Sequence, residues 1–368
     1  MRFVQFADTH LGRGEMKMEL RSAFAGACAL AVKREADLVL IPGDLFDYES
    51  ADPDTIAFVT RTLADIAPIP VLIAPGNHDS LQPRSPYFGE WPSNVTIFTT
   101  PEFETVTLGG LNCSVTGIAH AHRGITDRLR VPKRAASPFL SILLFHGSRD
   151  GYPSEKETVI PFSDAELIAQ GFTYAAIGHY HSFSKITDGD GRVCGAYSGC
   201  PQGRGLDETG EKCVLVGEID PEGRVSLEPV EVAERRIVRV DIDVTGSRDQ
   251  AEVFARVDDS ISRLAREQDV LHVFLKGMVP PAMEIDTSAW QSRQFRATLY
   301  TSGVEPDYDL ESLGRDSAAS PLRSIFVRKM LDRQGAAATD DDRRMLRDAI
   351  YYGLRALDRR PLEPRDVD

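Results

Sequence analysis

The most constraining feature of this sequence is a short apolar segment that runs directly into a polar turn, a pattern that occurs five times. In the clearest case, the apolar residues 71–74 lie between two prolines and lead into Gly76-Asn77-His78-Asp79. A short apolar run bounded by turn residues is typical of a buried strand. In open α/β sheets, ligands bind at the carboxyl ends of the parallel strands. We therefore expect this turn to present its polar side chains at a ligand-binding edge.

The other four cases are the apolar segments at residues 2–7, 38–41, 141–145 and 174–177. Each of them leads into aspartate or histidine. We expect the five strands to lie in one sheet and to bring their polar ends to one edge. The residues at these ends, which include five of the chain's eight histidines, are Asp8, His10, Asp44, Asn77, His78, His146, His179 and His181.

A metal site explains this set better than eight separate structural roles. Taken singly, each aspartate is explained as a turn former or helix cap, and each histidine as an ordinary hydrogen-bonded residue. Burying all of them together without a cation would cost free energy. Oxygen and nitrogen donors without cysteine suit Mn, Fe or Zn rather than a structural zinc site. Two ions that share a carboxylate, about 3.5–4 Å apart, are the usual arrangement for displacement at phosphorus.

These motifs resemble those of the calcineurin-like metallophosphoesterases. The resemblance implies that Asp44 bridges two ions. One ion would be held by Asp8, His10 and His181, and the other by Asn77, His146 and His179. The resemblance implies a different role for His78, which contacts the phosphate and is the candidate proton donor to the leaving oxygen. The implied cofactor is a pair of divalent ions, with Mn favoured and Fe, Zn and Mg as alternatives.

The surroundings of the motifs resemble one subgroup, the SbcD and Mre-eleven type nucleases that repair DNA double-strand breaks. Residues 7–12 and 42–47 carry this resemblance, and residues 197–204 are similar to the bacterial YhaO-like branch. Asp47 stands where archaeal and eukaryotic members carry histidine, which favours the bacterial branch. The resemblance covers residues 1–235. It implies a layered α/β fold, with β-sheets flanked by helices, and a DNA exonuclease or endonuclease that hydrolyses phosphodiester bonds with a metal-activated hydroxide.

Two other functions stay open. One is a phosphoesterase that acts on a small nucleotide or a phosphoprotein, and the other is a non-catalytic DNA-binding scaffold. The net charge of −14 argues against a simple nucleic-acid binder, so DNA would have to be held locally. Residues 123–134 are rich in basic side chains and form either such a patch or a solvated loop. The candidate substrate-binding residues are Arg123, Arg128, Arg130 and Arg204.

Three regions are expected along the chain. Residues 1–235 form the metallophosphoesterase (nuclease) domain, residues 236–305 a small α/β cap domain, and residues 306–368 a helical C-terminal tail. The tail has one amphipathic helix at 321–333 and a second that begins at the cap Thr339. Its apolar face either packs within its own domain or docks an SMC-like coiled-coil ATPase of the SbcC type. DNA and a second copy of the chain in a homodimer are the other expected partners.

The remaining expectations concern location and two further histidines. A strand that begins at residue 2 leaves no room for a signal peptide, and no apolar run approaches the length of about 18 residues needed to span a membrane. We therefore expect a cytoplasmic location and no membrane partner. His120 and His122 follow another apolar run, and alternation places both on the same side of an extended chain. They either contact substrate or are ordinary surface groups, and they are left out of the metal set.

Overall fold

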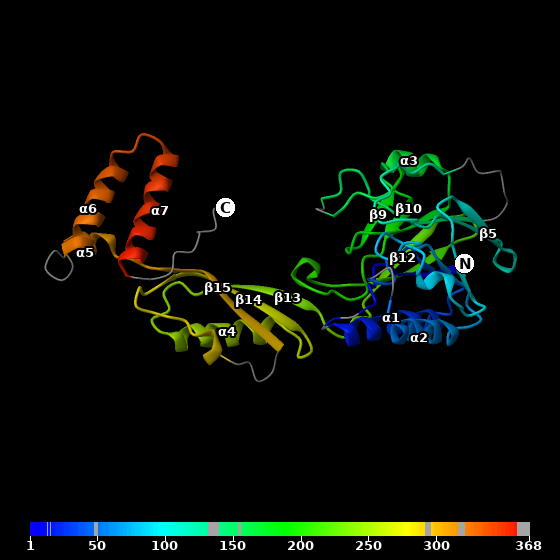
Figure 1. Cartoon of the computed structure of the whole chain (residues 1–368), viewed down its shortest axis with the longest axis horizontal. Coiled ribbons are helices and arrows are strands. Elements are labelled where there is room, and N and C mark those ends of the chain that lie inside the picture. The colour runs from blue at the N-terminus through cyan, green and yellow to red at the C-terminus, as the bar shows by residue number, and fades with distance from the viewer. Residues whose placement is uncertain are drawn as a thin grey trace. The chain divides into compact units, whose positions relative to one another are not determined.

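Figure 1 shows a computed structural model of the chain. It describes residues 1–12, 14, 16–47, 51–131, 140–153, 156–290, 296–315 and 321–358. The chain divides into two compact units, Met1–Ile237 and Val238–Asp368. The predicted roles of the three regions of the chain, as nuclease domain, cap and docking tail, stay predictions.

The first unit contains two six-stranded sheets. The strands of the first sheet are β1 (Arg2–Gln5), β2 (Leu38–Ile41), β3 (Val71–Ile73), β4 (Val95–Ile97), β11 (Val214–Ile219) and β12 (Val225–Val230). Their order is β12-β11-β1-β2-β3-β4, and β1 to β4 are parallel. The strands of the second sheet are β5 (Glu104–Leu108), β6 (Cys113–Gly117), β7 (Leu140–His146), β8 (Tyr174–Gly178), β9 (Ser184–Thr187) and β10 (Val193–Tyr197). Their order is β5-β6-β7-β8-β10-β9, with β6, β7, β8 and β10 parallel.

The prediction that the five motif-bearing strands share one sheet is wrong. Strands β1, β2 and β3 belong to the first sheet, whereas β7 and β8 belong to the second. The physical reason is that these segments are mostly apolar and largely buried on both faces, so their composition does not specify which strand each of them pairs with. The alternation of side chains shows how the two sheets are joined. Leu38 and Leu40 of β2 face the second sheet, and Val39 and Ile41 face the opposite side.

One buried polar residue links the two sheets near the ends of these strands. The side-chain amide of Gln5, on β1, donates to the carbonyl of Ala196 on β10 at 2.9 Å. The hydroxyl of Tyr174, on β8, donates to the Gln5 side-chain oxygen at 2.6 Å. Because Gln5 is fully buried, these bonds satisfy groups that would otherwise cost free energy to bury. They also fix the carboxyl end of β1 beside the second sheet.

Helices cover the outer faces of the two sheets. In Figure 1, α1 (Lys17–Lys33) and α2 (Pro53–Ala64) lie on one side of the first unit and α3 (Asp164–Ala169) on the other. Phe24 of α1 is fully buried against the first sheet. Helix α2 is capped by Asp52, whose carboxylate accepts from the Thr55 amide at 2.9 Å. In α3, Ser163 and Glu166 form a reciprocal capping box, as their spacing indicates.

The second unit begins with a three-stranded sheet of order β13-β14-β15. These strands are β13 (Ile237–Asp243), β14 (Val270–Val279) and β15 (Arg296–Pro306), and α4 (Gln250–Leu264) lies between the first two in the chain. Val253, Val257 and Ile261 of α4 pack against alternate residues of the sheet. Burying each such side chain contributes about 1.5–3 kcal/mol. The strands and helix expected in this region are therefore confirmed.

Three helices complete the second unit: α5 (Leu310–Arg315), α6 (Pro321–Gly335) and α7 (Asp340–Leu357). The predicted cap of α7 is confirmed, because the Thr339 hydroxyl accepts from the Asp342 amide at 3.1 Å. Ile350 and Leu354 of α7 are buried against α6, whereas Leu322 and Ile325 of α6 are exposed. Part of the apolar surface therefore forms a core between the helices, and the ATPase partner stays a prediction. No helix of the described residues is both long enough and apolar enough to cross a membrane.

Candidate metal centre

The ends of five strands, from both sheets of the first unit, bring the predicted metal ligands together. Three strands of the first sheet supply Asp8, His10, Asp44 and Asn77, and two strands of the second supply His146, His179 and His181. None of these seven side chains is more than 9% exposed. So many buried titratable groups in one place need internal charge compensation. The residue-level geometry divides them into two groups around Asp44.

The backbone at these positions is unusual. Asp8, His10, Asp44 and His179 all have positive φ angles, of 54°, 44°, 50° and 116°. Such conformations cost free energy for residues other than glycine and concentrate at functional sites. Hydrogen bonds between turns hold them, because the amides of Asp8 and His10 donate to the carbonyls of Gly43 and Asp44 at 3.1 and 3.0 Å. The strained turns let side chains that are close in sequence face the same point.

Two glycines allow the close approach of these turns. A Cβ atom at Gly76 would lie 2.2 Å from the carboxylate oxygen Oδ1 of Asp44. A Cβ atom at Gly178 would lie 1.9 Å from the carbonyl oxygen of Pro42. Any side chain at either position would therefore displace the neighbouring turn. The glycines of the Gly76-Asn77-His78-Asp79 and Gly178-His179 motifs are needed for packing as well as for turning the chain.

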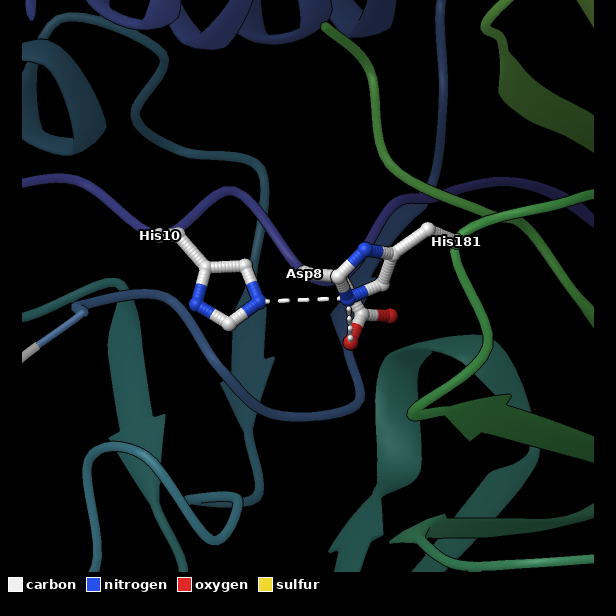
Figure 2. Close-up of side chains that lie close together, drawn as sticks. All are labelled: Asp8, His10 and His181. Carbon is white, nitrogen blue, oxygen red and sulfur yellow. Dashed lines mark hydrogen bonds and ion pairs between the residues drawn. The ribbon is translucent and has the colours of Figure 1, made fainter. Parts of the chain in front are cut away.

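The first group consists of Asp8, His10 and His181 (Figure 2). The Nε2 atoms of His10 and His181 face each other at 3.3 Å, and His181 Nε2 lies 3.5 Å from Asp8 Oδ1. The opposite nitrogens are turned toward carboxylates, with His10 Nδ1 3.2 Å from Asp47 and His181 Nδ1 2.5 Å from Glu208. A carboxylate only accepts, so Nδ1 of His181 carries a proton, and the Nε2 atoms of both rings are turned to the shared point. Two facing imidazole nitrogens and a carboxylate oxygen fit a divalent metal ion.

A cationic side chain already lies at this point. The ammonium group of Lys156 contacts Nε2 of His181. Burial lowers the pKa of Lys156, and Asp8, Asp44 and Glu208 oppose that shift by favouring the charged form. These three acids would favour a bound cation in the same way.

The second group consists of Asn77, His146 and His179. His146 Nδ1 donates to the Pro42 carbonyl at 3.0 Å, and its Nε2 atom lies 3.0 Å from Asn77 Oδ1. Nε2 of His179 is buried and has no hydrogen-bond partner among the described residues. Burial lowers the pKa of His179 to about 3, so the ring is neutral. An orphaned imidazole nitrogen beside converging acceptors also fits a metal ion.

Asp44 lies between the two groups. Its Oδ2 atom is 3.3 Å from Nε2 of His146 and 3.7 Å from Nε2 of His10. Burial by itself would raise the pKa of this carboxyl, but His146 and then His10 hold it well below its usual range. Asp44 is therefore a carboxylate, and one of its oxygens faces a histidine of each group.

His78 lies at the edge of this cluster. Its side chain is 31% exposed, unlike the buried ligand candidates, and its Nδ1 atom is 3.6 Å from Asp47. Its ring lies edge-on to that of His10, with centroids 4.8 Å apart. Its backbone amide donates to Asp44 Oδ1 at 2.9 Å, which fixes the turn. The side chain can therefore reach a ligand in solvent while its backbone is tied to the central carboxylate.

Three carboxylates of this region were not predicted as functional: Asp47, Asp79 and Glu208. Asp79 accepts from the amides of Gly76 and Phe46 and from the Tyr87 hydroxyl, and burial raises its pKa to about 6. It therefore holds the turn that carries Asn77. The available signal for Glu208 was its spacing of four residues from Arg204, which is typical of an ion pair. For Asp47, the only signal was its difference from the histidine of other family branches.

The predicted substrate-binding arginines are engaged with acidic residues. Arg128 pairs with Asp150 at 2.7 Å and with Glu166, and Arg123 lies 3.8 Å from Glu157. Arg204 turns inward and binds Glu208, whereas Arg130 is exposed. Lys133 and Arg134 of the expected basic patch lie outside the described residues. The roles of the four arginines in substrate binding stay predictions.

His120 and His122 do not lie on the same side, because the chain bends at residues 121–123 instead of continuing as a strand. His120 is fully buried, and its Nε2 atom lies 2.8 Å from the carbonyl oxygen of His146. Burial lowers its pKa to about 4. His122 is exposed. The expectation of a shared side is therefore wrong, and His120 supports the backbone of a ligand candidate.

Residues 1–183 match the family described as calcineurin-like phosphoesterase. The chain contains a calcineurin-like phosphoesterase domain. The family resemblance predicted from the five motifs is thus confirmed, and the domain is that of a hydrolase of phosphate esters. The family uses divalent metals, and this agrees with the candidate ligand clusters of the chain.

Two curated relatives support the expected branch of this family. The chain is 27% identical over 260 residues to the uncharacterized metallophosphoesterase YhaO of Bacillus subtilis, a match that covers 68% of the chain and 62% of YhaO. It is 27% identical over 217 residues to the DNA double-strand break repair protein Mre11 of Saccharolobus solfataricus, covering 55% and 54% of the two chains. The chain therefore spans less than two thirds of each relative.

A solved structure, a dimetal phosphatase from Danio rerio, is 10% identical, and the match covers 64% of this chain and 97% of that one with a TM-score of 0.41. The α/β fold class is shown by the sheets and helices of the chain itself and by the family match. The expected layered phosphoesterase fold is confirmed.

Proposed function

We propose that the chain is a two-metal phosphodiesterase that cleaves DNA. The observation that carries this proposal is the position of Asp44, whose Oδ2 atom faces His10 in one ligand group and His146 in the other. A carboxylate shared by two groups of donors is what a pair of neighbouring ions needs. The similarity to a DNA repair protein and the predicted branch support DNA as the substrate.

In this mechanism the chain's residues hold the ions, orient the reacting groups and supply a proton. The bound ions would activate a water nucleophile and offset charge on the phosphate oxygens. The residues that would hold one ion are Asp8, His10 and His181, and those for the other are Asn77, His146 and His179, with Asp44 shared. We propose manganese as the metal, with iron, zinc and magnesium as alternatives, because the donors are carboxylate, amide and imidazole.

His78 is the proposed proton donor to the leaving sugar oxygen. It is the most exposed of the eight motif residues, so its ring is accessible to substrate. The Asp47 carboxylate faces Nδ1 at 3.6 Å, which leaves Nε2–H as the group that would donate. Asp47 also keeps the ring in one orientation. A positioned general acid contributes about 10²–10⁴-fold to a rate.

The test compares three substrates with purified protein and manganese: double-stranded DNA with free ends, a chromogenic phosphodiester, and a phosphorylated peptide. The proposal expects cleavage of DNA and of the chromogenic diester, and loss of both activities in Asp44→Asn. Cleavage of the peptide or of the chromogenic diester, without cleavage of DNA, would replace the proposal by the small-substrate phosphoesterase. DNA binding without any cleavage would identify a scaffold.

A further inference from the structure

Three charged side chains connect the histidines of the first ligand group on the side away from the proposed ion. Asp47 Oδ1 lies 3.2 Å from His10 Nδ1 and 3.5 Å from Nη1 of Arg204. Nη2 of Arg204 donates to Glu208 Oε1 at 2.7 Å, and that same oxygen accepts from His181 Nδ1 at 2.5 Å. The Nε2 atoms of His10 and His181, which face each other at 3.3 Å, close the ring. We call Asp47, Arg204 and Glu208 the supporting ring.

The supporting ring is charged and well fixed. The Glu208 carboxylate accepts from Nδ1 of His181 and from the guanidinium group of Arg204. The Asp47 carboxylate lies between His10 and Arg204. Arg204 is fixed to Glu208 through its backbone amide as well as its guanidinium group. A carboxylate therefore lies beside the Nδ1 atom of each of the two imidazoles.

The second ligand group has no equivalent support among the described residues. His146 Nδ1 is held by a neutral carbonyl, that of Pro42. Asn77 contributes a neutral amide oxygen. The first group, by contrast, contains the Asp8 carboxylate and two imidazoles that are each backed by a carboxylate. A carboxylate behind a ligand histidine fixes its orientation and raises its basicity.

We propose that Asp47, Arg204 and Glu208 are positioning residues that make the first ligand group the tighter metal site, so that the two sites fill in order. This inference rests on the proposed two-metal function. The first ion would bind between Asp8, His10 and His181, and the second would bind at the less supported group. Because Asp47 Oδ1 also faces Nδ1 of His78 at 3.6 Å, the residue that supports the first ion also orients the proposed acid.

The experiment titrates metal-free protein with manganese and monitors the binding by calorimetry and by electron paramagnetic resonance. In the wild-type chain we expect two binding steps. Up to one equivalent the spectrum should show isolated ions, and beyond it an exchange-coupled pair. Glu208→Gln keeps the size of the side chain and removes its charge, and it should weaken the tighter step about 10- to 100-fold. The second step should change less, so the two steps should merge.

Asp47→Asn provides a second variant, because its side chain is 26% exposed and its replacement puts little folding stability at risk. The matched control is Glu228→Gln, which removes the charge from a comparable two-point pair with Arg34 in the same unit. The control should leave both steps unchanged. Circular dichroism and the thermal midpoint of the metal-free proteins show that a change in affinity is not a loss of fold.

Folded variants whose two steps match those of wild type would overturn the proposal, as would equal weakening of both steps or a coupled pair from the first additions of manganese to wild type. Failure of the proposed function looks different. A wild-type chain that binds two ions in order but cleaves no phosphodiester refutes the function and leaves the supporting ring intact. A wild-type chain that binds only one ion refutes both the two-metal function and ordered filling.

Discussion

The two units of this chain are built from the same kinds of element but differ in the residues that follow their strands. Both contain parallel strands covered by a helix: β1 to β3 with α1 and α2 in the first unit, and β14 and β15 with α4 in the second. In the first unit the strands end in buried carboxylates and imidazoles, whereas β14 ends at Val279 and runs into proline. Among the described residues, every residue other than glycine with a positive φ angle lies in the first unit.

This difference shows which unit contains the conformations and buried groups that cost folding free energy. The first unit sustains strained turns and buried charged groups, because large apolar clusters on both sides of the first sheet hold its strands in place. The second unit buries an ordinary apolar core and keeps its charged residues mostly at the surface. Chemistry is therefore expected from the first unit. The second unit is expected to affect stability and recognition.

The largest effect should come from Asp44, the carboxylate shared by the two ligand groups. Asp44→Asn removes the charge that would bridge both ions, and we expect loss of metal from both sites and a fall in DNA cleavage of more than about 10³-fold, as for removal of a central catalytic group. Metal analysis and a cleavage assay measure the two effects. Asp243→Asn, on the exposed face of β13, is the control from the second unit and should change neither. Full metal content in Asp44→Asn would contradict the shared role.

His78→Ala should come next. The variant should keep both ions and bind DNA, but its turnover should fall about 10²–10⁴-fold, because the leaving oxygen loses its proton donor. A chromogenic diester with a good leaving group needs little protonation, so the defect should shrink on that substrate. An equally large defect on both substrates would show that His78 contacts the phosphate without acting as an acid.

The independence of the two units can be tested through the core of the second one. Leu271 is fully buried between the β13-β14-β15 sheet and α4, and Leu271→Ala should lower the free energy of unfolding of that unit by about 2–5 kcal/mol. Manganese binding and cleavage of the chromogenic diester should be retained. Chemical denaturation followed by fluorescence measures the first effect. A loss of metal binding that parallels the loss of stability would show that the first unit depends on the core of the second.

The smallest effect should appear in the pH dependence of stability. Burial lowers the pKa of His120 to about 4, so between pH 6.5 and 4 this side chain binds a proton in the unfolded chain but not in the folded chain. The free energy of unfolding therefore has its full value above pH 6.5 and decreases as the pH falls toward 4. The decrease amounts to about 2–3 kcal/mol at pH 4.5. His120→Gln should remove this part of the acid sensitivity. Urea denaturation of metal-free protein at pH 7 and pH 4.5 measures it, and identical pH sensitivity in the variant would contradict the assignment.

Much of the local structure was predictable because it depends on neighbours in the chain. The caps at Asp52, Ser163 and Thr339 satisfy backbone amides within three residues, so the sequence alone indicates them. The strand-to-turn motifs also name the buried ligand candidates. The motifs do not specify which strands pair with one another. The prediction of a single sheet was wrong for this reason.

The sequence by itself determined the family, the positions of the strand ends and the kinds of side chain that they carry. Only the tertiary structure decided that the ligands come from two sheets and that the supporting ring exists. Asp47 and Arg204 are 157 positions apart, and His10 and His181 are 171 apart. Contacts over such separations arise from how sheets pack and turns approach, and no periodicity or local propensity encodes them. The side chains were visible in the sequence, but their partners were set by the fold.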